Sequence, residues 1–479
     1  MNIPSKPPRK TLGLTGITLN AMTLVAPGAF AWLLYQPQLA AQQSGLPGIW
    51  PGVLLALVTA LLTAFSFGQL ARRYPEAGLR SAYHFAEQVF RDSAHPLPPG
   101  LAHFTKFLTG WVAHLYYWVY PGVMVAFMGI LVDASLRHFG YQPTAFGQIL
   151  LAASCAAFIG FLALRGITGS TVSSVVLNTL QLLALGVFVV LAILFRSLAP
   201  AGLAGSLTFE QILLPQGARG LVFQAALAMM LMVGFEAVTS LSASAENPGR
   251  DIPRASILAL LIQGAFSYLL VYFAIGAALN GQIDPASRAP VGDLAIQIGN
   301  RLLSGNGLAL MLVLAFATAI ALLAAMLSAM NNGVRISFSM SLDAEMPGLL
   351  SVLHPKYATP YYTVILLGLL SALIGCWGIL GGLPALMGLI LAANLGAFLL
   401  YAILGVLTLA SFAATPTFHW LKHGLLPVTT IVLNLGIAIS ALAFGLGAGG
   451  ILAQASQLAL AVSAAWMLLS LFAYFARRR

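Results

Sequence analysis

The sequence predicts an all-α protein that crosses a membrane about twelve times. Of its 479 residues, 59% are apolar and only 7% are charged, whereas a soluble globular protein carries about 25% charged residues. Apolar stretches of about 20 residues recur along the whole chain, and each is long enough to cross a bilayer as a helix. No linker or low-complexity tract indicates a second domain.

Each expected helix rests on one apolar window. In chain order the windows are 12–35, 48–71, 104–132, 144–165, 171–195, 218–242, 255–279, 307–332, 360–380, 384–411, 425–446 and 452–475. The first window follows a basic tail, residues 1–11, and extends to Tyr35. It exceeds the roughly 7–15 residues of a signal-peptide core, so we interpret it as an uncleaved first membrane helix. The longest expected connections are 72–103, 196–217, 280–306 and 333–359.

The basic residues orient these helices. With the N-terminus in the cytoplasm and twelve crossings, seventeen of the 22 Lys and Arg residues lie on the cytoplasmic side, as the positive-inside rule requires. We therefore expect a multi-pass protein of the cell inner (cytoplasmic) membrane with both termini in the cytoplasm. The net charge of +10 does not indicate a nucleic-acid partner, because the basic residues sit at helix ends and form no basic face with interleaved aromatics. The expected surroundings are the lipid bilayer.

Two of the apolar windows are interrupted at matching places. The first contains Ala26-Pro27-Gly28-Ala29-Phe30, and the sixth, five helices later, contains Gly234-Phe235-Glu236. Interrupted helices in corresponding positions of two halves indicate an inverted-repeat transporter with a central binding site. Helices one to five, about 12–195, and helices six to ten, about 218–411, are then the two repeats.

Glu236 is the acid that this pattern places at membrane depth. A carboxylate at the centre of a membrane helix costs roughly 2.5–3.5 kcal/mol, so such groups usually face a partner or a water-filled cavity. Gly234 weakens the helix beside it, and lipid cannot satisfy the freed backbone groups. Glu236 is predicted to bind a substrate amine, carry a proton or act as a gate. The alternative is a structural role, as a carboxyl group that caps the broken backbone.

The stretch from Gly234 to Ala255 resembles the sixth-helix signature of the amino acid–polyamine–organocation (APC) superfamily. The matching runs are Gly234-Phe235-Glu236-Ala237 and Asn247-Pro248-Gly249-Arg250-Asp251-Ile252-Pro253-Arg254-Ala255. Shorter segments agree: Tyr74-Pro75-Glu76-Ala77-Gly78, Leu164-Arg165-Gly166, Asn331 to Arg335 followed by Asp343, His354-Pro355 and Thr359-Pro360. The resemblance covers about residues 12–412.

The resemblance implies a LeuT-type 5+5 inverted repeat with helices one and six interrupted. Residues 12–412 would be the transporter core, and 413–479 would add two peripheral helices and a short basic tail. It also implies a small-molecule substrate, an amino acid or amine, bound at the two breaks by Ala26, Pro27, Gly28, Ala29, Phe30, Gly234, Phe235, Glu236 and Ala237. Half-helix ends carry the partial charges that suit a zwitterion.

Three positions depart from the family pattern. Pro27 stands at the break in helix one, where the resemblance implies that backbone N–H groups bind the carboxylate of the substrate. Proline has no backbone N–H, so it removes one of these donors. Ala243 and Ser244 occupy positions that are often acidic in the family, and Gln181 occupies the position where some proton-coupled members have a lysine. These departures leave the substrate and the coupling ion open.

The candidate cavity-lining residues beyond the breaks are Trp32, His114, Tyr117, Gln181 and Ser328. Each also has a plain structural interpretation, as packing or as an interhelical hydrogen bond. No cofactor or metal is expected, because the sequence has no catalytic or nucleotide-binding motif and its two cysteines lie in apolar runs.

We therefore expect a secondary active transporter of an amino acid that works by alternating access, coupled to H⁺ or working by exchange. The alternatives are a polyamine or organic-cation transporter of the same fold, and a sodium-coupled symporter, since helix eight offers hydroxyls and carbonyls to Na⁺. A membrane enzyme and a channel are disfavoured, because paired titratable residues and a repeated pore motif are both missing from the sequence. The oligomeric state and the direction of transport stay open.

Overall fold

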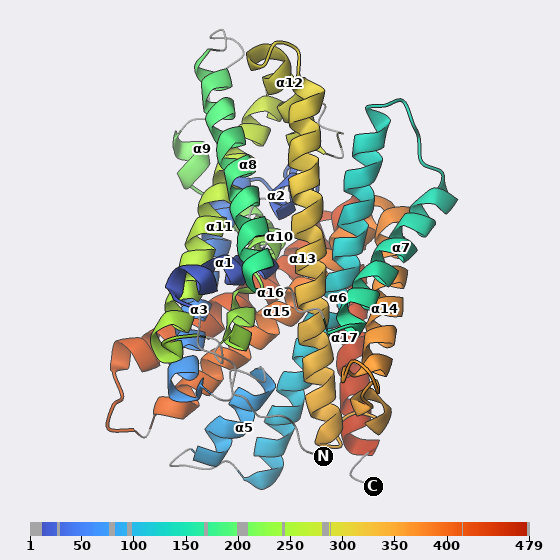
Figure 1. Ribbon diagram of the computed structural model, residues 1–479. Helices are drawn as coiled ribbons and strands as arrows, with labels where there is room; N and C mark the ends of the chain where they lie inside the picture. Colours follow the sequence, from blue (N-terminus) through green and yellow to red (C-terminus); the bar gives the residue numbers. More distant parts are fainter. Residues whose placement is uncertain are drawn as a thin grey trace.

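The computed structural model describes residues 12–25, 29–75, 82–92, 98–166, 171–198, 209–241, 245–279, 287, 289–413 and 415–476. This part of the chain is helical, with no strand (Figure 1). The helices are α1 (Leu14–Val25), α2 (Ala29–Gln43), α3 (Ile49–Arg73), α5 (Ala82–Asp92), α6 (Pro99–Arg137), α7 (Ala145–Leu164), α8 (Thr171–Ser197), α9 (Phe209–Leu213), α10 (Ala218–Ala228), α11 (Pro248–Leu279), α12 (Pro290–Leu302), α13 (Gly307–Leu342), α14 (Tyr361–Leu380), α15 (Gly382–Phe412), α16 (Leu426–Ala448) and α17 (Gly450–Ala476), with the 3₁₀ segments η1 (Met229–Leu231), η2 (Phe235–Leu241) and η3 (Gly348–Ser351) and the π-helical segment η4 (Trp420–Leu425).

The predicted membrane helices are confirmed, with one qualification about their number. Within the described residues, eleven helical stretches are long and apolar enough to cross a bilayer. The first predicted helix is divided between α1 and α2, which have 12 and 15 residues and are each too short to cross alone. The break predicted at Ala26, Pro27 and Gly28 lies outside the described residues.

The connections between the predicted membrane helices contain further helical residues. Residues 333–342 continue α13, and α5, α9 and α12 lie within the other three long connections. Most of the charged run from Asn247 to Arg254 is helical, since α11 begins at Pro248. Proline suits the first turn of a helix, where its missing N–H would have no partner.

The halves of the two interrupted helices pack against each other. α1 contacts η2 and α11, while α2 contacts α10. The long helix α6 runs through the bundle in contact with α13, α14 and α15, and α15 also contacts α16 and α17. Figure 1 shows α12 at one end of the bundle and α5 at the other; we call these the α12 end and the α5 end.

A polar cluster ties the α5 end together. Lys106 of α6 lies 2.7 Å from Asp343 and 3.5 Å from Glu87 of α5. The hydroxyl of Tyr83, also on α5, lies 2.7 Å from carboxylate oxygens of Asp343 and of the buried Glu345. Partial burial alone would raise the pKa of Asp343, but hydrogen bonds from Lys106 and Tyr83 and the charge of Lys106 outweigh it, so this pKa is lowered.

This lowered pKa predicts how stability depends on pH. A depressed folded-state pKa stabilises the protein above the ordinary value of about 3.9 and loses that contribution as the pH falls through the folded-state value. We expect Asp343→Asn to lower the melting temperature near neutral pH, and the difference from wild type to shrink as the pH falls below about 4. Melting curves of both proteins over a pH series test this. A difference that widens in acid would contradict it.

Candidate functional site

The sixth membrane helix is broken over more residues than the sequence predicted. The α-helix ends at Ala228, and η1, a turn and η2 follow. Gly234 has φ = 106°, a left-handed conformation that glycine adopts without the strain of a side chain. The prediction placed the break only at Gly234-Phe235-Glu236. It missed the earlier start because residues 229–233 are uniformly apolar, and hydropathy cannot separate an α-helix from a 3₁₀ helix.

Glu236 is buried and hydrogen-bonded at this break. Its Oε1 accepts from the Tyr117 hydroxyl at 2.9 Å, and its Oε2 accepts from the Tyr401 hydroxyl at 2.9 Å. Oε2 also accepts from the backbone N–H of Gly234 at 3.2 Å. The carboxylate therefore joins η2 to α6 and α15 and satisfies a backbone group that the break has freed. This is the structural role that the sequence left open beside a functional one.

Close helix packing brings the two tyrosines together. A Cβ at Gly396 would lie only 2.7 Å from the backbone N of Tyr116, so α15 approaches α6 at a distance that only glycine allows. Phe235 lies between the Tyr401 ring, at 5.3 Å, and the Phe67 ring of α3, at 6.2 Å. The sequence missed Tyr401. Its only signal was a single hydroxyl in an apolar stretch of the tenth helix.

The structure describes only some of the remaining candidate residues in helices one and six. Ala26, Pro27 and Gly28 lie outside the described residues. Ala29 and Phe30 begin α2, and the structure describes their backbone alone. Ala237 follows Glu236 in η2 and is half-buried.

Among the other candidates, Tyr117 donates a hydrogen bond to Glu236. Trp32 is buried on α2 against α12, where a Cβ at Gly292 would come within 2.7 Å of its ring. Gln181 is buried on α8, one turn after Asn178, which donates to the Leu19 carbonyl of α1 at 2.7 Å. Ser328 is half-buried on α13. The structure therefore does not gather all the candidates into one cluster.

His114 is part of a separate buried network. Its Nε2 lies 2.9 Å from Ser337 Oγ, which also accepts from Trp118 Nε1 at 3.3 Å and donates to the Gly333 carbonyl at 2.8 Å. The histidine thus fastens α6 to α13. This geometry favours its packing role over a proton relay to Glu236.

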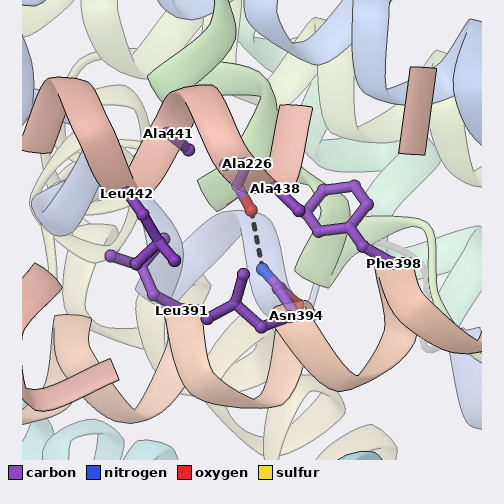
Figure 2. A pocket seen from close by; sticks show the side chains of 8 residues that line it. Ala226, Leu391, Asn394, Phe398, Ala438, Ala441 and Leu442 are labelled. Atoms are coloured by element: carbon purple, nitrogen blue, oxygen red, sulfur yellow. Dashed lines mark hydrogen bonds between the residues drawn. The ribbon is translucent and has the colours of Figure 1, made fainter. Parts of the chain in front are cut away.

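A second polar side chain, Asn394 of α15, donates a hydrogen bond to the broken helix on the N-terminal side of the break. Asn394 of α15 donates from Nδ2 to the Ala226 carbonyl at 2.7 Å (Figure 2). Carbonyls in the last turn of an α-helix lack N–H partners within the helix. The Asn394 amide is therefore a donor to such a carbonyl. Beside it lies a cavity of about 10 Å³ between α10, α15 and α16, which has room for about one water molecule. It is too small for an amino acid.

Comparison with known proteins places these features in a family. The family model described as amino acid permease matches residues 10–475. The chain is 25% identical over 377 residues to the branched-chain amino acid permease BcaP of Bacillus subtilis, covering 74% of this chain and 72% of that protein. It is 24% identical to the methylthioribose transporter of the same organism, with 72% and 70% covered. It is 26% identical to the low-affinity putrescine importer PlaP of Escherichia coli K12, with 66% and 65% covered.

A solved structure shares the fold. The crystal structure of MhsT in complex with L-phenylalanine aligns with a TM-score of 0.62 and 15% identity, covering 90% of this chain and 99% of that one. This likeness confirms the predicted LeuT-type architecture. The relatives are named as a permease, a transporter and an importer, which supports a role other than enzyme catalysis.

The contribution of the Tyr117 and Tyr401 hydroxyls to protein stability can be measured. We expect Tyr117→Phe and Tyr401→Phe each to destabilise the protein by about 1–2 kcal/mol, between the ~0.6 kcal/mol average of interhelical membrane hydrogen bonds and the ~1.5–3 kcal/mol of bonds to charged groups. Tyr35→Phe is the control, because its buried hydroxyl has no partner among the described residues. Unfolding measurements that give all three variants the same stability would contradict the assignment.

Proposed function

This chain belongs to the amino acid permease family, and on that premise we propose that it is a secondary active transporter that carries an amino acid across the cytoplasmic membrane by alternating access. The observation that carries the proposal is the broken sixth helix, with a buried carboxylate fixed beside its freed backbone. Breaks of this kind expose peptide dipoles at membrane depth, where they suit a zwitterionic solute. Relatives named for amino acid transport support this substrate class.

We place the α5 end in the cytoplasm, since the positive-inside rule supports that orientation. Residues 12–412 act as the transporter core, and α16 and α17 are additions at its edge. The proposed binding residues are those at the two breaks, with Tyr117 and Tyr401 holding Glu236. We also propose that transport is coupled to protons or proceeds by exchange, because Glu236 is the carboxylate at the break.

The second candidate is transport of a polyamine or another organic cation by the same fold. A carboxylate at the break favours it, as does the relative named as a putrescine importer. A melting-temperature screen of purified protein against amino acids, including L-leucine, and amines, including putrescine, distinguishes the two. Stabilisation by amines alone would replace the amino acid proposal.

The role of Glu236 can be tested by Glu236→Gln. Glutamine keeps the size of the side chain and one oxygen acceptor, but it cannot hold a negative charge or exchange a proton at neutral pH. We expect uptake by proteoliposomes to fall at least about tenfold, as for loss of a charged hydrogen-bonding group, while the protein stays folded. Asp293→Asn on α12 is the matched carboxylate-to-amide control. Wild-type uptake by Glu236→Gln at every pH would refute the role.

The coupling ion is tested with imposed gradients. We expect an inward proton gradient to drive uptake of the substrate into proteoliposomes or, for exchange, preloaded substrate to accelerate it. A sodium gradient without a pH difference should have little effect. Uptake that follows sodium and ignores both pH and preloading would establish the sodium-coupled alternative.

A further inference from the structure

Three basic side chains lie where two membrane helices end next to each other. Arg72 and Arg73 are the last residues of α3, which leads along the chain to α5, and Lys422 lies in η4, the first part of the span Trp420–Ala448. Arg72 and Lys422 are exposed, and Arg73 is half-buried. Because both spans end here, these side chains lie at the boundary between the bilayer and water. We call them the basic cluster.

An aromatic stack brings the two parts of the basic cluster together. The guanidinium carbon of Arg73 lies 5.0 Å from the centre of the Phe412 ring, at the C-terminus of α15. The imidazole of His423 stacks on the same ring, with centroids 3.9 Å apart and planes 8° from parallel. His423 Nδ1 also accepts from the backbone N–H of His419 at 3.1 Å, which fixes this ring. The ends of α3 and α15 therefore meet η4 at Phe412, and Lys422 directly precedes the stacked His423.

The basic cluster carries a net positive charge. Residues 346–479 contain no Asp or Glu, so η4 has no acid near it along the chain. No residue of the cluster forms an ion pair with a described residue. The acids whose side chains lie outside the described part of the chain are Glu76, Asp92 and Asp284. Even an ion pair with Glu76, the nearest of them in sequence, would leave two of the three cations for an anion.

An exposed apolar strip leads away from the cluster along α16. Leu425, Val428 and Val432 are 48%, 44% and 61% exposed, and their spacing i, i+3, i+7 places them on one face of a helix. Trp420, at the start of η4, is 66% exposed, as is typical of aromatic side chains at the level of lipid headgroups. Cations next to an exposed apolar strip match a ligand that has an anionic head and a hydrocarbon chain. A soluble anion would use the cations alone.

We propose that the basic cluster and the apolar strip bind one anionic phospholipid, with its headgroup phosphate at the cluster and an acyl chain along Leu425, Val428 and Val432. Arginine and lysine donate charge-assisted hydrogen bonds to phosphate oxygens. In the orientation proposed above, the lipid comes from the cytoplasmic leaflet, where anionic lipids attract basic residues beside membrane spans. The bound lipid joins the end of α3 to η4, and its binding does not depend on which solute the protein carries.

A fluorescent probe can measure which lipids surround the apolar strip. In a background that replaces Cys155 and Cys376 by Ala, bimane is attached to Val428→Cys or, as the reference, to Leu373→Cys, a 68% exposed position of α14. Brominated phosphatidylglycerol and brominated phosphatidylcholine are compared as quenchers in proteoliposomes. We expect the preference for phosphatidylglycerol to be at least about fivefold greater at Val428→Cys, since one basic residue near an anionic lipid accounts for a factor of this size.

Substitutions in the basic cluster test which side chains produce this preference. Lys422→Gln and Arg73→Gln should each lower it by about fivefold, whereas Lys422→Arg keeps the charge and should retain it. Lys356→Gln is the matched control, because Lys356 is another exposed lysine in the part of the chain that has no acids, and it should leave the preference unchanged. Melting curves in phosphatidylcholine establish that each variant is folded.

Two results with the probe would overturn the proposal. One is an equal preference at Val428→Cys and Leu373→Cys, which would mean that bulk lipid surrounds the strip. The other is a preference that survives both Lys422→Gln and Arg73→Gln in folded protein.

Inorganic phosphate distinguishes a lipid headgroup from a free anion. The melting temperature of detergent-solubilised protein is measured with phosphatidylglycerol and with sodium phosphate at equal ionic strength. We expect phosphatidylglycerol alone to raise it in wild type and to lose this effect in Lys422→Gln. If phosphate raises it equally and Lys422→Gln removes both effects, the cluster binds a soluble anion and the lipid proposal fails.

Discussion

The structure depends on the need to satisfy backbone groups that a broken helix leaves bare inside a membrane. The sixth helix stops being α-helical at Ala228, and two side chains, one from α15 and one from the broken helix itself, bind backbone groups on either side of the break. Asn394 takes the Ala226 carbonyl on one side of the break, and Glu236 takes the Gly234 N–H on the other. Without such partners each unpaired group would cost several kcal/mol in hydrocarbon.

Because of this constraint, the structural role of Glu236 and the functional role that we propose for it are not alternatives. The same carboxylate that closes the break is fixed by hydroxyls from α6 and α15, two helices that belong to different repeats of the predicted architecture. Any change in what Glu236 binds therefore changes how the two repeats are joined. A solute that competed for one of its oxygens would act on the helix packing directly, which is the differential contact that the proposed alternating access needs.

The sequence predicted the features that depend on hydropathy and missed those that depend on geometry. The membrane helices, their order and the acid at the break follow from apolar windows and the cost of a buried charge. The start of the break at Ala228, the continuation of α13 over residues 333–342 and the short helices α5 and α12 do not, because amphipathic or uniformly apolar residues fit several backbone conformations. Tyr401 was missed for a related reason: its partner lies 165 residues away, and spacing along the chain carries no information about that contact. The first break and its Pro27 stay predictions.

The 3₁₀ geometry of η2 has a mechanical consequence. A 3₁₀ helix rises about 2.0 Å per residue and an α-helix about 1.5 Å, so the seven residues of η2 are about 3.5 Å longer than they would be in α form. Rewinding η2 as an α-helix would shorten it by the same amount. A change in the winding of η2 alone would thus alter its length by more than half the pitch of an α-helical turn, without a hinge or a bend.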